Sequence, residues 1–301
     1  MKRNDLVTGI LCAIGCEVLY GASYIFTKQA TTVASELSLL GWRFLVAFVI
    51  MSLCVFLRII KVDIKGKKLR PLLIVALFSP VIYFIGETAG ISNTTASESG
   101  VFLACIPVAS LIASTVILHK KPSRLQITGI LITLIGVSIT VLAVGVSSSL
   151  SVIGYAFLLA AVISYALYAV FVDKAAGYSA AEITYIMIVA GAIVFVVLAI
   201  GEALIGGSVI QLLTMPFREA NFLSAILYQG IGCSIFAFFL SNAAIARIGV
   251  NRTASFIGVS TVVSVITGTV VLKEMFTVWQ GFGAAVIIIG VYIANARITE
   301  G

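Results

Sequence analysis

Ten long apolar runs dominate this sequence, and they constrain the fold more than any motif does. Each run is close to the roughly 20 residues that an α-helix needs to cross the hydrocarbon layer of a membrane. The runs cover residues 6–27, 36–57, 71–91, 96–118, 125–144, 152–172, 182–205, 221–243, 252–272 and 279–297. We therefore expect an all-α membrane protein with ten transmembrane helices, whose main partner is the lipid bilayer.

The composition supports this class and argues against several others. Hydrophobic residues make up 61% of the chain and charged residues 10%, against about 25% charged residues in a soluble domain. The excess of Lys and Arg is typical of loops that follow insertion topology, so we expect no nucleic-acid partner. His119 is the single histidine and all five cysteines lie in apolar runs, so we expect no metal and no cofactor. The first run lacks a cleavage pattern and is interpreted as a retained span.

The basic residues predict how the chain lies in the membrane. With the N-terminus inside, fifteen of the nineteen Lys and Arg residues fall on the inner side. Lysine and arginine accumulate in cytoplasmic loops. We therefore expect a multi-pass protein of the cell membrane with both termini in the cytoplasm. Pro71 follows a basic stretch and suits the first turn of a helix.

The chain contains an internal repeat. A shift of 154 residues aligns Phe102, Ser110, Thr115, Gln126, Gly129 and Gly136 with Phe256, Ser264, Thr269, Gln280, Gly283 and Gly290. A shift of 145 residues aligns Gly9, Tyr20 and Phe26 with Gly154, Tyr165 and Phe171. The two units, 6–144 and 152–297, hold five spans each. Because five is odd, the second unit must enter the membrane upside down, and inverted repeats of this kind place a substrate site between the halves.

Taken in order, these motifs resemble the drug/metabolite transporter superfamily, in its ten-span branch built from two EamA-type domains. The first unit carries "LYGASYIFTK", "GWRF" and "ASESGVFLACIPVASLIASTVIL", and the second carries "RTASFIGVSTVVSVITGTVVLKE" and "WQGFGAAVIIIGVYI". The resemblance implies a carrier without ATP hydrolysis, whose central cavity is lined mainly by spans one, three, four, six, eight and nine. The family's usual Leu-Gly-Glu after the fourth span is Leu118-His119-Lys120 here, and Pro107 has Thr261 as its counterpart.

We single out four ionisable residues within the spans: Glu17, Arg43, Glu87 and Glu98. Such groups are costly in hydrocarbon and usually face the interior of the bundle. At about 1.5 Å per residue, Glu17 lies about 16 Å deep, near the midplane. The other three share an outer layer, where Arg43 can form an ion pair with one of the two carboxylates. This pair is either purely structural or part of a gate.

Glu17 is the candidate coupling site because it has no cation within helical reach. Burial disfavours the charged form of a carboxyl group, which suits competition between a proton and a cationic substrate. A glutamate in the first span also marks the small multidrug resistance proteins of the same superfamily, which "CEVLYGASYIFTK" resembles in outline. The alternative is an inert Glu17 that is hydrogen-bonded to a Tyr or Ser across the bundle.

Aromatic and small polar residues complete the expected substrate cavity. The candidates are Tyr20, Tyr24, Tyr83, Glu87, Glu98, Tyr165, Tyr168, Ser260 and Ser264. Aromatic faces suit organic cations and planar metabolites, whereas the serines can equally serve close helix packing.

These features favour a secondary transporter over the alternatives. We expect a proton-coupled exporter of small organic solutes, such as amino acids, amines or drug-like metabolites, that works by alternating access. The alternative is a substrate-selective channel or facilitator without proton coupling. No catalytic set is visible, so we expect no enzyme. The sequence leaves open whether the protein is a monomer or a homodimer.

Overall fold

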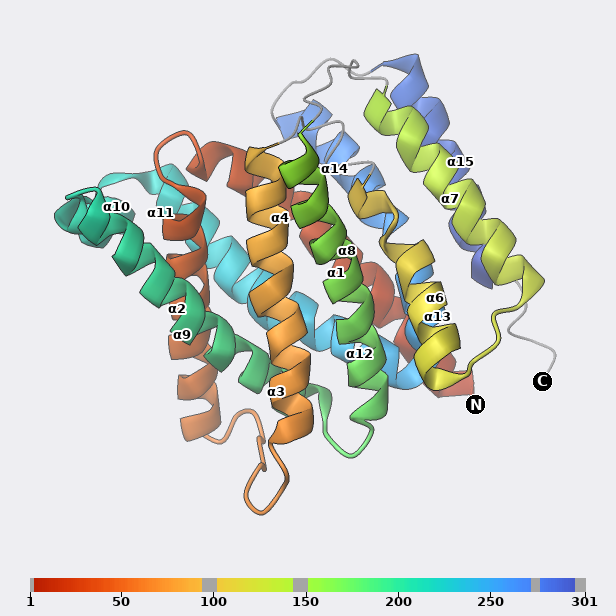
Figure 1. The fold of residues 1–301 in the computed structure, drawn as a ribbon, viewed down its shortest axis with the longest axis horizontal. Coiled ribbons are helices and arrows are strands. Elements are labelled where there is room, and N and C mark those ends of the chain that lie inside the picture. The colour runs from red at the N-terminus through yellow and green to blue at the C-terminus, as the bar shows by residue number, and fades with distance from the viewer. Residues whose placement is uncertain (1–2, 94–101, 143–150, 272–276, 296–301) are drawn as a thin grey trace.

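The computed structural model describes residues 3–93, 102–142, 151–271 and 277–295, apart from the side chains of Arg3, Tyr24, Lys28 and Ser92, and the regular elements in these ranges are helical. In chain order they are α1 (Arg3–Ala30), α2 (Glu36–Phe56), α3 (Arg70–Ala76), η1 (Leu77–Ile82), α4 (Tyr83–Ser92), α6 (Ile106–Leu118), α7 (Arg124–Leu142), α8 (Val152–Lys174), α9 (Ala180–Ile205), α10 (Val209–Arg218), α11 (Ala220–Leu227), η2 (Tyr228–Ala237), α12 (Phe238–Ile248), α13 (Val250–Ser255), α14 (Gly258–Val271) and α15 (Val278–Asn295). Figure 1 shows them as one bundle of long helices.

The lengths of these helices fit a multi-pass membrane protein. Within the described ranges, nine helices are long and apolar enough to cross a membrane. Two of them, Arg70–Ile91 and Ala220–Ile248, each join several elements into one span. The fourth apolar run is represented by the shorter helix Phe102–Leu118. The residues before it, 94–101, lie outside the described part, so a count of ten spans stays a prediction.

Local sequence signals explain where several helices begin. Ser35 and Ser151 cap α2 and α8 by accepting hydrogen bonds from backbone N–H groups three residues ahead. This arrangement satisfies a donor that the first helical turn leaves free. At α9, Ser179 and Glu182 form a capping box. Pro71 lies in the first turn of α3, as its position after the basic stretch predicts.

The internal repeat is visible in how α7 and α15 begin. The backbone N–H of Ser123 donates to Gln126 Oε1 at 3.0 Å, and the Gln126 N–H donates to Ser123 Oγ at 3.1 Å. Thr277 and Gln280, 154 residues later, form the same reciprocal pair at 2.9 and 3.2 Å. This is the capping-box arrangement in both copies, so the aligned residues perform the same local task.

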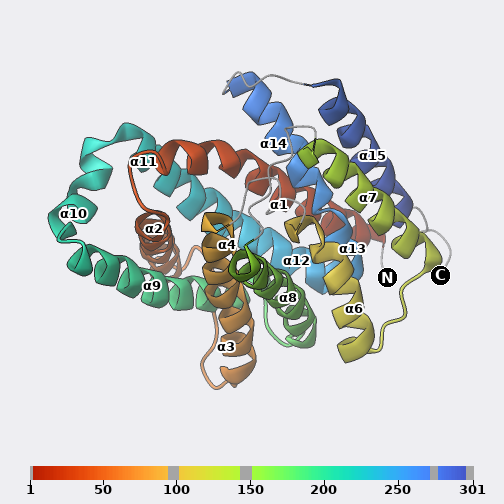
Figure 2. The same ribbon diagram turned by 45° about the horizontal axis from the view of Figure 1, so that its top comes forward.

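The packing of the helices follows the order of the two predicted repeats. α1, the first helix of one repeat, packs against α12 and α14, whereas α8, the first helix of the other, packs against α4 and α6. α2 packs against α9, and α7 packs against α15. Figure 2 shows these last two pairs at opposite ends of the molecule, with α1, α4, α8 and α12 between them.

Four glycines bring α7 and α15 into very close contact. A Cβ atom added to Gly129 would lie 2.6 Å from the carbonyl oxygen of Gly290, and one added to Gly136 would lie 2.9 Å from that of Gly283. Gly129 precedes Gly136 while its partner follows that of Gly136, so the two helices run antiparallel. Contacts between small residues of this kind allow backbones to approach in membranes.

Two spans are interrupted by π-helical segments in matching places. η1 lies within the third span and η2 within the eighth, the corresponding spans of the two predicted repeats. In η1, Ser79 leaves the helical conformation with φ −141° and ψ 121°, because the residue before a proline disfavours helical geometry. The hydroxyl of Ser164 on α8 donates to the carbonyl of Phe78 at 2.7 Å within this segment.

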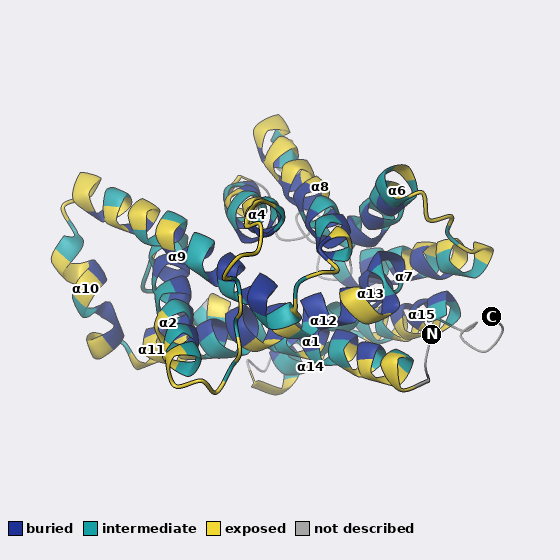
Figure 3. Cartoon of the chain, turned by 90° about the horizontal axis from the view of Figure 1, so that it is seen from below, coloured by how far each residue is buried: buried dark blue, intermediate teal, exposed yellow. Residues whose placement is uncertain are grey.

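The connections between the helices lie at the two ends of the bundle. The connections 57–69, 119–123 and 175–179 lie together at one end, which we call the basic end, where α1 begins and α15 ends (Figure 1). The turn 31–35 and the connection 206–208 lie at the other end, which we call the pocket end. Between them, buried residues face the inside of the bundle and exposed residues lie outward (Figure 3). Many of the exposed side chains are large and apolar, as contact with lipid tails requires.

The contact between α7 and α15 predicts a position-specific effect of adding one methyl group. A Cβ at Gly129 would lie 2.3 Å from the backbone nitrogen of Ala294. We expect Gly129→Ala to lower the free energy of unfolding by about 1–3 kcal/mol through overpacking. The melting temperature of the purified protein in detergent measures this effect. Gly201→Ala on α9, where nothing lies within 4 Å of the added Cβ, is the control. Equal melting temperatures for the two variants would contradict the prediction.

Candidate functional site

Glu17 lies inside the bundle, near the middle of α1. It is 5% exposed, and its hydrogen-bonding neighbour is Ser260 on α14. The Ser260 hydroxyl donates to the carbonyl of Ile257 at 2.6 Å. Because a hydroxyl has one proton to donate, Ser260 in this geometry can accept a hydrogen bond from a protonated Glu17. The site thus contains a buried carboxyl group with a hydroxyl neighbour.

Three tyrosines form an aromatic row next to Glu17. The ring centroids of Tyr83 and Tyr165 are 5.6 Å apart, and those of Tyr165 and Tyr168 are 5.4 Å apart. Tyr83 donates its hydroxyl proton to Glu87 Oε1 at 2.8 Å. Glu17 lies within electrostatic range of both Tyr83 and Tyr165. The row therefore joins α4 and α8 to the carboxyl group on α1.

Tyr168 is committed to contacts within the protein. It is 2% exposed, and its hydroxyl lies 2.8 Å from Asn242 Oδ1 and 3.2 Å from Ser241 Oγ. The side-chain amide of Asn242 in turn donates to Thr184 Oγ1 at 3.0 Å. In this geometry the network ties α8 to α12 and α9, and Tyr165, which is less buried, presents more surface to a solute.

Arg43 does not form an ion pair with Glu87, one of the two carboxylates that the sequence offered as its partner. Its Nε donates to Ser234 Oγ in η2 at 2.8 Å, and its guanidinium carbon lies 4.7 Å from the ring centroid of Phe84. The ion pairs between described residues are elsewhere, and Glu87 instead accepts the hydrogen bond from Tyr83. Glu98 lies outside the described residues, so its pairing with Arg43 stays a prediction.

The serines of α14 serve close packing against α1 in this structure. Ser264 Oγ donates to the carbonyl of Gly21 at 3.0 Å. A Cβ added to Gly21 would lie 2.6 Å from the carbonyl oxygen of Ser260. Tyr20 lies one residue before this crossing and is half-buried. The side chain of Tyr24 is not among those described, so its part in a cavity stays a prediction.

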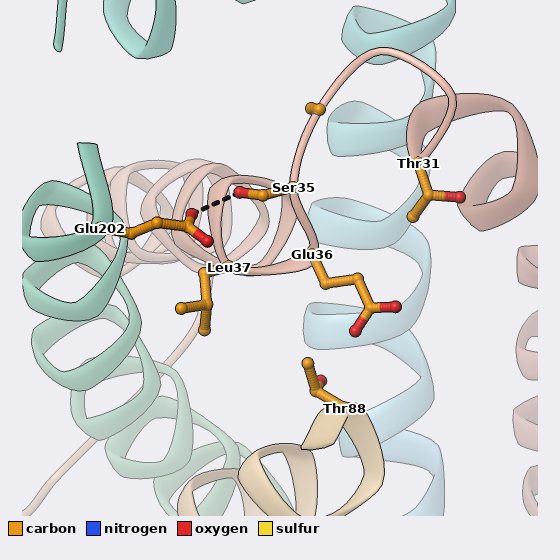
Figure 4. A pocket seen from close by; sticks show the side chains of 7 residues that line it. Thr31, Ser35, Glu36, Leu37, Thr88 and Glu202 are labelled. Atoms are coloured by element: carbon orange, nitrogen blue, oxygen red, sulfur yellow. Dashed lines mark hydrogen bonds between the residues drawn. The ribbon is translucent and has the colours of Figure 1, made fainter. Parts of the chain in front are cut away.

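A pocket of about 460 Å³ lies at the pocket end, and sequence reasoning missed it. It is lined by Thr31, Ala34, Ser35, Glu36, Leu37, Thr88 and Glu202. Figure 4 shows Glu202 and Glu36 on opposite sides of it, with Thr88 on a third side and the hydrogen bond from Ser35 to Glu202 drawn. Glu36 and Glu202 stand at opposite ends of their apolar runs, and only the antiparallel packing of α2 and α9 brings them together.

Comparison with known proteins supplies the family. The model of the EamA-like transporter family matches residues 7–142 and again 152–296. The chain belongs to the EamA-like transporter family. This confirms the resemblance read from the motifs.

Relatives of this EamA-family chain are themselves described only as transporters. It is 29% identical over 302 residues to the uncharacterized transporter YcxC of Bacillus subtilis, covering 100% of this chain and 96% of that protein. It is 27% identical to YetK of the same organism, covering 84% of this chain and 76% of that one. A crystal structure at 15% identity superposes with a TM-score of 0.76, covering 95% of this chain and 98% of that one. That likeness supports the helical fold, and the relatives support transport.

The described part of this EamA-family chain contains no group of three or more His, Cys, Asp or Glu side chains placed to hold a metal ion. The groups that the structure brings together at the centre are carboxyl groups, phenols and a guanidinium, held between α1, α2, α4, α8 and η2. These groups can bind a small polar solute and move a proton.

The assignment of Tyr168 to a buried network can be tested directly. Tyr168→Phe removes the hydroxyl and leaves Asn242 Oδ1 without that donor. An unsatisfied buried acceptor costs about 1–3 kcal/mol, so we expect a lower melting temperature. Tyr292→Phe, at a side chain that is 75% exposed, is the control and should leave the melting temperature unchanged. Unchanged stability in Tyr168→Phe would overturn the assignment.

Proposed function

We propose that this protein is a proton-coupled secondary transporter that exports small organic solutes across the cell membrane by alternating access. The family and the apolar helices support a multi-pass transporter. Amino acids, amines and drug-like metabolites are the solutes that suit a centre made of carboxyl groups and aromatic rings. The basic end faces the cytoplasm, because lysine and arginine accumulate on that side, so both termini are cytoplasmic.

The architecture behind this proposal is two inverted five-helix repeats, 6–144 and 152–297. The antiparallel crossing of the equivalent helices α7 and α15 supports it. The helix packing also supports it, because the first helix of each repeat packs against helices of the other: α1 against α12 and α14, and α8 against α4 and α6. The π segments η1 and η2 interrupt corresponding spans, and interruptions of this kind point to a substrate site at the repeat interface.

The observation that carries the proposed coupling is the position of Glu17. It is a carboxyl group 5% exposed, midway along the first span, beside the tyrosine row. In transporters, carboxyl groups inside the membrane commonly act as proton relays. The Ser260 hydroxyl can accept a hydrogen bond from the protonated carboxyl group, and it can donate to the carboxylate when it turns from Ile257 toward Glu17. Competition between the proton and the solute for Glu17 would link proton release to solute binding.

The contacts at the two ends of the bundle supply the alternating states. At the basic end, Lys67 pairs with Glu182 at 2.8 Å and Lys120 with Asp173 at 2.5 Å. The Tyr178 hydroxyl also donates to the carbonyl of Lys68. At the pocket end the bundle is hollowed by the pocket between α2, α4 and α9. This arrangement fits a conformation that is closed at the basic end and open at the pocket end.

Replacing the buried carboxyl tests the coupling. In proteoliposomes, Glu17→Gln should abolish proton-driven accumulation, because glutamine cannot release a proton, while exchange of labelled solute persists. The solute is one that raises the melting temperature in a screen of amino acids, polyamines and aromatic cations. Asp5→Asn, an exposed carboxylate on the same helix, is the control. Unchanged proton-driven accumulation in Glu17→Gln would remove the mechanism, and the absence of saturable exchange in the unmodified protein would favour a channel.

Weakening the basic end tests alternating access. Glu182 is 4% exposed and is held by Lys67, so Glu182→Gln should favour opening at the basic end and closure of the pocket. A cysteine placed at Leu37 in a cysteine-free background reports this as slower labelling by an impermeant thiol reagent. Glu219→Gln, which takes part in neither ion pair, is the control. Equal labelling rates in the two variants would contradict the gate.

A further inference from the structure

Arg43 lies in the interior of the protein with a hydrogen-bond donor left over. The residue is 6% exposed. Its Nε is used by Ser234, at 2.8 Å. Its Nη2 is buried and has no hydrogen-bond partner. The N–H groups of Nη2 are therefore buried away from water and lack a hydrogen-bond acceptor.

A donor in this condition is costly for the folded protein. Leaving a buried polar group unsatisfied costs about 1–3 kcal/mol, and more when the group is charged. Within the described ranges the ion pairs are Lys67–Glu182 and Lys120–Asp173, and neither involves Arg43. Glu87 lies within electrostatic range of Arg43, but it is hydrogen-bonded to Tyr83. The described residues thus supply charge near Arg43 without an acceptor for Nη2.

The surroundings of Arg43 are those of the proposed solute path. From α2 it reaches Ser234 in the π segment η2 and the ring of Phe84 on α4, and Tyr20 on α1 is within electrostatic range. Glu36, which lines the pocket, precedes it by seven residues on α2. Two turns of helix put Glu36 and Arg43 on the same face, about 10 Å apart along the axis. Arg43 therefore lies below the pocket, where spans one, two, three and eight meet.

We propose that Arg43 is the docking point for a carboxylate group of the transported solute, an inference that rests on the proposed transport function. Carboxylates are the natural acceptors for a guanidinium N–H. Glu87 is a carboxyl group within electrostatic range of Arg43, so whenever it is ionised it disfavours a multiply charged anion such as phosphate. The solute class is therefore a small monocarboxylate whose remainder is neutral or positively charged and lies against Tyr83 and Phe84. This inference narrows the proposed solutes to those with a carboxylate group, so it predicts that simple amines and polyamines do not bind at Arg43.

The test compares carboxylates with amides of the same shape. The probes are benzoate with benzamide, phenylacetate with phenylacetamide, and phenylalanine with phenylalaninamide, each titrated against the detergent-purified protein while the melting temperature is followed. We expect at least one carboxylate to raise the melting temperature while its amide does not. In Arg43→Gln the affinity for that carboxylate should fall by about 30-fold or more, as for truncation of one partner of a buried charge pair.

Two further variants keep the test decisive if Arg43→Gln does not fold. Arg43→Lys keeps the charge without the guanidinium geometry and should also weaken carboxylate binding. Ser234→Ala keeps the guanidinium and removes its structural partner, so it should retain the preference for the carboxylate. Both variants could melt at a lower temperature than the unmodified protein when no ligand is present, while the carboxylate still raises the melting temperature of each by the same amount as in the unmodified protein. That result would show that Arg43 is structural only.

The outcomes separate this inference from the proposed function. The inference fails if none of the carboxylates shifts the melting temperature, if acid and amide shift it equally, or if the Arg43 variants bind the carboxylate as well as the unmodified protein. Binding that depends on Arg43, in a protein that shows no saturable exchange in proteoliposomes, would support the docking point while overturning the transporter. Exchange of the carboxylate by Arg43→Gln at an unchanged KM would overturn the docking point alone.

Discussion

The whole structure depends on how the backbone satisfies its hydrogen bonds in hydrocarbon. Unsatisfied N–H and C=O groups are prohibitive there, so spanning segments are helical and interruptions need side chains as partners. η1 and η2 are such interruptions. Ser164 on α8 donates to the backbone near η1, and Tyr228 in η2 donates to the carbonyl of Leu19 on α1 at 3.0 Å. The first helix of each predicted repeat is thus hydrogen-bonded to the irregular span of the other.

This cross-support explains why polar groups gather at the centre. A π segment turns side chains away from the regular helical face, and Ser234 in η2 is thereby placed against Arg43 on α2. Tyr83 follows η1 directly and reaches both Glu87 and Tyr165. The buried carboxyl group of Glu17 interacts electrostatically with Tyr83 and Tyr165, so the proposed proton site and the proposed solute site both lie next to an irregular span. In the proposed mechanism, protonation or solute binding at one of these groups changes its interactions with the others.

Much of the fold could be predicted from the sequence because its signals are periodic and local. Apolar run lengths predicted the spans and Pro71 a helix start, whereas the packing of Gly129 and Gly283 became visible only in the structure. Axial rise also predicted that Glu17 is deep. Spacing along one helix, however, says nothing of how neighbouring helices are rotated. For that reason the sequence could not tell which of the two carboxylates, Glu87 or Glu98, faces Arg43, and the pocket between Glu36 and Glu202 was not foreseen. The π segments add so little length that the hydrophobic pattern hides them.

The glycine contact between α7 and α15 has the form of an isologous interface, in which residue i of one surface meets residue j of the other and the converse also holds. Gly129 meets Gly290, and Gly136 meets Gly283, where Gly283 and Gly290 are the aligned copies of Gly129 and Gly136. Two separate five-helix chains inserted in opposite directions could form the same contact. A five-helix chain with the sequence of one half, inserted in both orientations, would therefore already contain the glycine contact that α7 and α15 form here.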